Sequence, residues 1–168
     1  MTHEPAPNPR ALGPVATLAL SAFGLGLSPV MPGTVGSLGV VVAMWLFPSS
    51  LISGLALLAL LFVYGVVATL RFANLVSGPD AHGDPGWVVS DEVAGQALAC
   101  LPVVLLGGSY WDLGLAFVLF RVFDIWKPGP VGRAERIPGA RGVLLDDLVA
   151  AVLALPIIIL VTAMGWLP

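Results

Sequence analysis

The stretch LISGLALLALLFVYGVVATLRFANLV, residues 51–76, carries a single charged side chain, Arg71, in a long and largely apolar run. A helix needs about 20 apolar residues to cross a bilayer, so this stretch is long enough to cross. It lacks the period-two alternation of a half-buried strand, and open sheet edges are not viable in hydrocarbon. We therefore expect a membrane-spanning helix here, and residues 148–167 meet the same length requirement.

The composition of the whole chain agrees with a bilayer as its solvent. Of the 168 residues, 58% are hydrophobic and 10% are charged, and the mean hydropathy is +0.98. These values lie outside the range of soluble globular proteins. No Gly/Ser-rich linker divides the chain, so we expect one membrane-embedded domain over residues 11–168. A flexible tail over residues 1–10, which holds three prolines, is expected to precede it.

Four further apolar segments are separated by turn-forming residues. They lie near residues 11–27, 34–47, 93–107 and 111–123, and the last three fall short of a full crossing. Residues that stop helices mark the turns at 47–50, 77–86 and 107–112. The sequence therefore predicts an all-α, polytopic integral membrane helical bundle with some short or partly spanning helices. A homodimer could complete those short helices.

The basic residues predict which side of the membrane the loops face. If the chain turns at each break, all seven Lys and Arg residues belong to one side, together with nine of the ten acids. Only Asp112 lies opposite. The positive-inside rule assigns the basic side to the cytoplasm. The net charge of −3 leaves no long basic stripe to cover phosphates, so we expect no nucleic-acid partner.

Three acidic clusters fall on this side, each beside an apolar segment. They are Asp91 and Glu92 in SDEVAGQ, Asp124 in FRVFDIWKP, and Asp146 and Asp147 in LLDDLVAA. Small residues follow the acids at helical spacing and let helices approach closely, among them Gly95, Ala150, Ala151 and Ala154. We therefore expect the acids to converge. Five such charges at depth would cost roughly 10 kcal/mol or more, so a cation must offset them.

Magnesium suits such a site, because it takes oxygen ligands and is commonly held by one or two carboxylates together with a substrate phosphate. Zinc is less favoured, since the chain has one cysteine and two histidines and lacks an HExxH motif. A second interpretation stays open. The acids could instead cap helices or pair with nearby bases, such as Arg121 with Asp124.

Basic side chains near the acids are candidate ligands for a phosphate group. Arg121 and Lys127 flank Asp124 closely, and Arg141 precedes the last acidic pair. An arginine can bind phosphate with two parallel hydrogen bonds, and a lysine binds it as a point charge. The other basic residues of this segment, Arg133 and Arg136, suit lipid headgroups equally well.

A third candidate element is LSPVMPGTVGSLG, residues 27–39, where Pro and Gly precede a helix expected to begin near Thr34. The exposed backbone N–H groups at a helix start favour anions. With the hydroxyls of Thr34 and Ser37, and with Gly33 beside them, they would form a phosphate-binding loop. The motif lacks the Lys-Ser/Thr ending of a Walker A loop.

Four motifs, taken in this order, resemble the bacterial phosphatidylglycerophosphatase A family. They are GLGLSPVMPGTVGSLG (24–39), VVSDEVAGQ (88–96), FRVFDIWKPGPVG (120–132) and GVLLDDLVA (142–150). The resemblance implies a magnesium-dependent membrane phosphatase of phospholipid biosynthesis. It would hydrolyse phosphatidylglycerophosphate to phosphatidylglycerol and phosphate, at a site facing the cytoplasm in a multi-pass protein of the bacterial cytoplasmic membrane.

The resemblance also implies site residues by position. The acidic catalytic and metal-binding residues would be Asp91, Glu92, Asp124, Asp146 and Asp147. The phosphate-binding residues beside them would be Arg121, Lys127, Pro32, Gly33, Thr34, Gly36 and Ser37. A catalytic part for His82 is left open.

The reaction that suits such a site is hydrolysis of a phosphate monoester. Metal ions would neutralise the transferring phosphoryl group and activate a water molecule for in-line attack. An aspartyl-phosphate formed by Asp124 or Asp147 is the alternative route. The runner-up enzyme is a metal-dependent phosphatase or phosphotransferase for another lipid phosphate. The non-enzyme alternative is an ion-coupled membrane transporter, which predicts acids at mid-depth and an internal repeat.

Overall fold

The computed structural model describes residues 12–48, 50–77 and 85–168, and every regular element in these ranges is a helix. The predicted all-α class is confirmed for this part of the chain. The predicted N-terminal tail and His82 lie outside it. The elements are α1 (Pro14–Leu20), a short 3-10 helix (Leu25–Leu27), α2 (Pro32–Leu46), α3 (Leu51–Phe72), α4 (Asn74–Ser77), α5 (Ser90–Leu106), α6 (Tyr110–Trp126), α7 (Gly129–Ala134) and α8 (Ala140–Met164).

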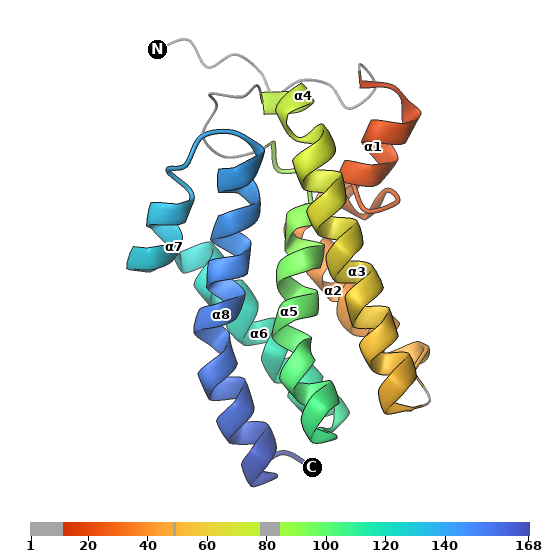
Figure 1. Cartoon of the computed structure of the whole chain (residues 1–168), viewed down its shortest axis with the longest axis vertical. Coiled ribbons are helices and arrows are strands. Elements are labelled where there is room, and N and C mark those ends of the chain that lie inside the picture. The colour runs from red at the N-terminus through yellow and green to blue at the C-terminus, as the bar shows by residue number, and fades with distance from the viewer. Residues whose placement is uncertain (1–11, 49, 78–84) are drawn as a thin grey trace.

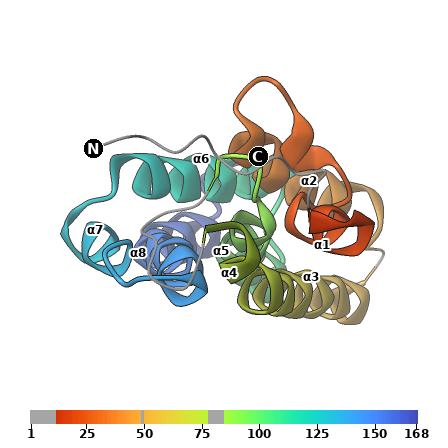
Figure 2. The ribbon, with the colours of Figure 1, turned by 90° about the horizontal axis from the view of Figure 1, so that it is seen from above.

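Helix α5 lies at the centre of the bundle. It contacts α8, α3, α2 and α6, and the view along the bundle in Figure 2 shows these helices arranged around it. In Figure 1 the helices α3, α5, α6 and α8 run roughly side by side, and α1 and α4 lie at one end. The chain reverses direction between successive long helices. The first residues of α2, α5 and α8 therefore lie at the same end of the bundle as the last residues of α3 and α6.

Local sequence explains where the long helices begin and end. Ser50 caps α3, because its side chain accepts from the backbone N–H of Ser53. Ser109 and Asp112 form a capping box at the start of α6, in which Asp112 Oδ2 accepts a hydrogen bond from the backbone N–H of Ser109 at 2.7 Å. Gly107 ends α5 in the left-handed conformation at φ 67°, which costs glycine little. These signals lie at the predicted turns.

Two sequence-based boundaries were wrong. The segment 11–27 does not form one helix in its described part, because the chain turns after Leu20, with Ala22 and Phe23 in left-handed conformations. The last helix begins at Ala140, earlier than the predicted 148. The predicted loop 124–147 therefore contains a short helix and the first two turns of a long one, and Asp146 and Asp147 lie inside that long helix.

The outward faces of the bundle are apolar. Large hydrophobic side chains are exposed along the outer long helices α3, α6 and α8, for example Val67, Val118 and Val152, each more than half exposed. By length and composition, two helical segments are able to cross a membrane, Leu51–Val76 and Ala140–Met164, and α2 is shorter. Buried positions near the ends of the helices carry several acids instead. This distribution is the reverse of that in a soluble protein.

Gly95 allows the close contact of α5 with its neighbours. A Cβ atom built there would lie 2.6 and 2.8 Å from ring atoms of Phe120 and 3.1 Å from the Cβ of Asp147. Phe120 is fully buried, as are Ala150 and Ala154 on α8. The prediction that small residues bring the acid-bearing helix faces together is therefore confirmed.

We predict that Gly95→Ala destabilises the protein, whereas Gly114→Ala does not. Both glycines lie inside helices, but a Cβ at Gly114 meets nothing within 4 Å. The first substitution forces the Phe120 ring to move and should cost about 1–3 kcal/mol. The second gains helix propensity and should raise stability slightly. Thermal unfolding of the two variants in detergent measures the difference, and equal melting temperatures would contradict the packing described here.

Candidate active site

Three carboxylates from two helices converge at the end of the bundle where α5 begins. Asp91 and Glu92 lie in the first turn of α5, and Asp147 lies two turns into α8. One oxygen from each of the three lies within 4.8 Å of the others. Asp91 and Asp147 are buried. The positive end of the α5 dipole favours negative charge at this position, but three carboxylates so close together repel one another strongly.

Asp146 faces a different partner from Asp147. Successive residues of an α-helix point about 100° apart, so neighbouring acids cannot both face α5. Asp146 Oδ2 accepts a hydrogen bond from Lys127 Nζ at 2.7 Å, and the same ammonium donates to Glu135 Oε1 at 2.7 Å. The structure thus places Asp146 in an ion-pair network beside the carboxylate group rather than within it. Glu135, at the end of α7, was not singled out by its sequence.

Asp124 adjoins the carboxylate group from α6 and is held by an arginine. Arg121 Nη1 lies 2.6 Å from Asp124 Oδ2 and 3.7 Å from Glu92 Oε1. The pairing of Arg121 with Asp124, which belonged to the second interpretation of the acids, is present. The Arg121 side chain is only 14% exposed, and its Nε is buried without a hydrogen-bond partner in the described part of the chain. Arg121 therefore links α6 to α5 and keeps a donor for another acceptor.

Lys127 occupies an unusual backbone position for a lysine. It is the residue that ends α6, in the left-handed conformation at φ 48°, where glycine is usual and another residue costs roughly 1–2 kcal/mol. Its ammonium bridges α7 and α8, which gives the lysine a structural role there. Burial alone would lower the pKa of Lys127, but hydrogen bonds to Asp146 and Glu135 raise it above its ordinary value of 10.5. The ammonium stays charged at neutral pH.

The start of α2 lies against the same carboxylates. The helix begins at Pro32, two residues before the predicted start, after Met31 in a left-handed conformation. A Cβ added to Gly33 would collide with the carboxylate of Glu92 and lie 3.4 Å from Arg121 Nη1. Gly33 is therefore close to the site, as predicted, and a side chain at this position would displace the Glu92 carboxylate.

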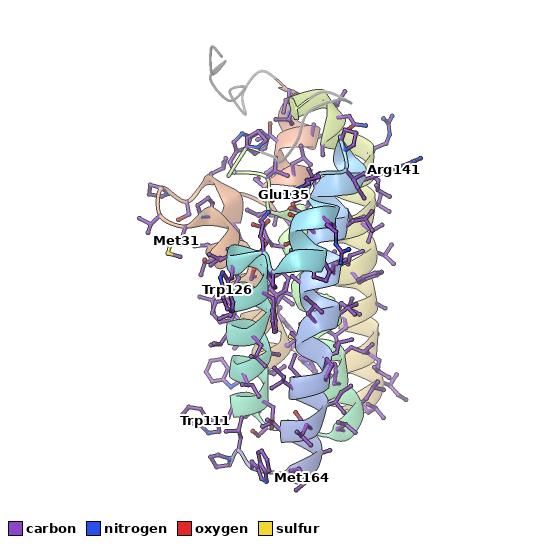
Figure 3. All side chains as sticks on the ribbon, turned by 90° about the vertical axis from the view of Figure 1, so that its left-hand side faces the viewer. Met31, Trp111, Trp126, Glu135, Arg141 and Met164 are labelled. Atoms are coloured by element: carbon purple, nitrogen blue, oxygen red, sulfur yellow. The ribbon has the colours of Figure 1, made fainter. Side chains whose placement is uncertain are left out.

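Of the other predicted phosphate ligands, Thr34 has an unpaired hydroxyl among the described residues, Ser37 bonds within its own helix, and Arg141 lies away from the site. Thr34 Oγ1 is buried and has no hydrogen-bond partner among the described residues. Ser37 is fully buried, and its hydroxyl donates to the carbonyl of Gly33 at 2.9 Å, so it bonds within its own helix. Arg141 is exposed, and Figure 3 shows it at the far side of the bundle from Met31 and Trp126, pointing away from Glu135. The structure does not bring Arg141 to the carboxylates.

The donor set fits a hard divalent cation. Three carboxylate oxygens lie close together, and they belong to a cluster of six acids that contains two cations, Arg121 and Lys127. Magnesium prefers oxygen donors of this kind. Gln96, one turn after Glu92 on α5, has a fully buried amide. Its Nε2 donates to Cys100 Sγ at 3.3 Å, and its Oε1 has no hydrogen-bond partner in the described ranges. Its place in the SDEVAGQ motif was the one signal in the sequence for this residue.

Comparisons with known proteins identify the family of the chain. The pattern of the phosphatidylglycerophosphatase A family matches residues 18–162. The chain is 31% identical over 134 residues to "Phosphatidylglycerophosphatase A" of Escherichia coli, covering 79% of this chain and 74% of that protein. It is 33% identical over 160 residues to the protein of the same name from Haemophilus influenzae, covering 88% of each.

A third relative carries a different name. It is "Putative phosphatidylinositol-3-phosphatase" of Bacteroides thetaiotaomicron, 36% identical over 149 residues, which cover 87% of this chain and 91% of that protein. No solved structure matches the chain. The family pattern covers all four acid-bearing and glycine-rich motifs, and three acids of these motifs, Asp91, Glu92 and Asp147, meet in space. The chain therefore belongs to the phosphatidylglycerophosphatase A family.

Proposed function

We propose that the chain removes the terminal phosphate of phosphatidylglycerophosphate, with Mg²⁺ held by Asp91, Glu92 and Asp147. Family membership supports a phosphoric monoester hydrolase. The observation that carries the proposal is the approach of these three carboxylate oxygens within 4.8 Å, beside Arg121. Such a group supports metal-assisted phosphoryl transfer better than it supports helix capping, because capping needs no contact between helices.

When bound, Mg²⁺ would supply positive charge for the phosphoryl oxygens and polarise the attacking water. The protein's own residues account for the rest of the reaction. Arg121 has a spare Nε donor for a phosphate oxygen, and the Thr34 hydroxyl lies at the same place. The acids of the cluster are the available acceptors for the proton of the water. Attack forms a bond from the water oxygen to phosphorus and breaks the bond from phosphorus to the glycerol oxygen. The proton that an acid of the cluster takes from the water then passes to the glycerol oxygen, which leaves as the alcohol.

Lys127 and Asp146 have a positioning role in this proposal. Their salt bridge, extended to Glu135, ties the end of α6 and the short helix α7 to α8. It thereby holds Asp124 and Asp147 at a constant separation. Since the ammonium already donates to two carboxylates at 2.7 Å, Arg121 is the stronger candidate for binding the substrate phosphate.

The surface of the bundle supports a location in the bacterial cytoplasmic membrane with several crossings. Two segments are long and apolar enough to cross, and the exposed side chains of α2, α3, α6 and α8 are largely apolar. The basic side chains Arg71, Arg121, Lys127, Arg133, Arg136 and Arg141 belong to the ends of helices or to connections at the site end. The positive-inside rule then directs the site toward the cytoplasm.

A second lipid phosphate is a reasonable alternative substrate. The Bacteroides thetaiotaomicron relative is named for phosphatidylinositol 3-phosphate and matches most of this chain. Both lipids present a phosphate monoester on a headgroup at the membrane surface, and the described acids do not distinguish them. Parallel assays with the two lipids would rank them.

We predict that Asp91→Asn and Asp147→Asn each lower phosphate release by about a hundredfold or more, because each removes a charged oxygen donor from the group. Asp112→Asn is the matched control. Asp112 is also buried, but it lies at the other end of α6, where it accepts from Ser109 and Thr162. Asp112→Asn should lower the free energy of unfolding, but the protein that remains folded should release phosphate at a near-normal rate.

Phosphate release from purified protein in mixed micelles is the measurement, and thermal unfolding reports the folded fraction. Near-normal turnover in Asp91→Asn and Asp147→Asn would remove both from the site. Equal losses in these variants and in Asp112→Asn would mean that any buried acid matters equally, which contradicts a localised active site.

We also predict that a chelator abolishes turnover and that added Mg²⁺ restores it. Direct titration of Mg²⁺ by calorimetry should show binding to the wild-type protein and at least tenfold weaker binding to Asp147→Asn. Turnover that persists after exhaustive chelation would exclude the metal while leaving the phosphatase activity itself in place. Asp112→Asn should bind Mg²⁺ like the wild type.

Lys127→Met tests the positioning role. The variant leaves Asp146 and Glu135 without their counter-ion, so we expect the free energy of unfolding to fall by about 1–3 kcal/mol. Arg133→Met, on the exposed face of α7, should change it by less than about 0.5 kcal/mol. Denaturant unfolding in detergent measures both. If Lys127 instead binds the substrate phosphate, Lys127→Met will raise KM with little loss of stability.

A further inference from the structure

A groove of about 430 Å³ runs along the outer face of α6 beside the start of α2. This volume falls within the range of small-ligand pockets, roughly 300–1,000 Å³. Its walls are apolar, and two of its lining residues carry strongly polar groups, Thr34 and Arg121. Met31 and Trp126 also line the groove, and Figure 3 shows both on the same side of the bundle.

The α6 residues of the groove form one stripe. They follow helical spacing, so that Phe117 and Val118 lie one turn before Arg121, and Ile125 and Trp126 lie one turn after it. The stripe is about 13 Å long at 1.5 Å per residue. Arg121 therefore divides it into an inner apolar part toward the middle of the bundle and an outer part toward the end of α6.

The groove meets the carboxylate cluster at its two polar residues. Arg121 lines the groove and also contacts Asp124 and Glu92. Thr34 lines it and carries a buried hydroxyl without a hydrogen-bond partner in the described chain. A ligand with an anionic headgroup and an apolar tail would satisfy both features at once, because its headgroup would reach Arg121 while its tail lay on apolar side chains.

A second apolar groove of similar size shows why the first is the better site. It lies between α3 and α5, has a volume of about 400 Å³, and is lined by Leu, Ala and Phe side chains such as Leu55, Phe62 and Leu101. No polar side chain lines it. A lipid tail could rest there as it would on any apolar surface, but nothing would hold its headgroup near the acids.

We propose that the inner part of the α6 groove binds an acyl chain of the lipid phosphate substrate, with the headgroup held at Arg121 and Thr34. This inference rests on the proposed function and names the part of the protein that selects a lipid over a soluble phosphate ester. The tail lies on Phe117 and Val118, toward the middle of the bundle. Trp126 and Met31 flank the headgroup, where an aromatic ring suits a membrane interface.

The test fills the groove without touching the acids. Val118→Trp places a large ring on the proposed path of the tail, and Val152→Trp makes the same change on α8. The two valines match in exposure, at 53% and 52%, so both variants should fold. Each is assayed on long-chain phosphatidylglycerophosphate in mixed micelles and on the same headgroup with its acyl chains removed.

Val118→Trp should lower kcat/KM for the long-chain lipid by about tenfold, equivalent to losing the burial of roughly two methylene groups. Its kcat/KM for the deacylated headgroup should stay at the wild-type value, and Val152→Trp should change neither. Unchanged long-chain turnover in Val118→Trp would overturn the inference, as would equal losses on the two substrates or equal effects of the two variants. A wild-type protein that hydrolyses neither substrate would refute the proposed function itself.

A binding measurement keeps the inference testable if the deacylated headgroup is turned over too slowly. A phosphatidylglycerophosphate with a photoactivatable group on its acyl chain is cross-linked to Asp147→Asn, and the labelled peptides are identified. We expect labelling within residues 117–122, and Val118→Trp on the same background should lower it severalfold. Labelling concentrated on the α3–α5 groove, or spread evenly over all exposed helix faces, would overturn the inference.

Discussion

The constraint on which this structure depends is an excess of negative charge in an apolar bundle. Three carboxylates meet near the start of α5, and three more, Asp124, Asp146 and Glu135, pair with the two cations beside them, Arg121 and Lys127. Two like charges about 5 Å apart repel by roughly 3 kcal/mol even at an effective dielectric constant of about 20. This repulsion destabilises the fold, so stability alone does not explain why the chain has such a cluster. The arrangement is best explained if a cation and an anionic substrate share the site.

The fold divides the acids into groups with different partners. Asp91, Glu92 and Asp147 face one another across α5 and α8, where Gly95 removes the side chain that would keep the helices apart. Lys127 draws Asp146 away toward Glu135, and Arg121 holds Asp124. Lys127 therefore pairs with two flanking acids and Arg121 with a third, and one oxygen of each central carboxylate lies within 4.8 Å of the others.

Much of this arrangement could be predicted from the sequence, because the strongest signals were local. Apolar runs gave the long helices, and small residues at helical spacing showed which faces approach. The break after Leu20 was missed, because Ala22 and Phe23, which adopt left-handed conformations there, are not turn-forming residues and continue the apolar run. The sequence analysis also missed that Asp146 and Asp147 point in different directions. This follows only when both residues are placed inside a helix, and the predicted helix began after them, at residue 148. The pairing of Lys127 with Glu135 arises from the intervening short helix, which spacing along the chain cannot reveal.

The lengths of the helices explain why a lipid phosphate suits this site. Helices α2, α5 and α6 have 15, 17 and 17 residues, whereas α3 and α8 have 22 and 25. In Figure 1, α8 continues past the level at which α6 gives way to α7. The acids thus lie at the level where the shorter helices begin or end. The longer helices continue past this level, and their outward side chains are apolar. A headgroup could reach that level while its tails remained against apolar side chains, so binding would need little extraction of the lipid from its bilayer.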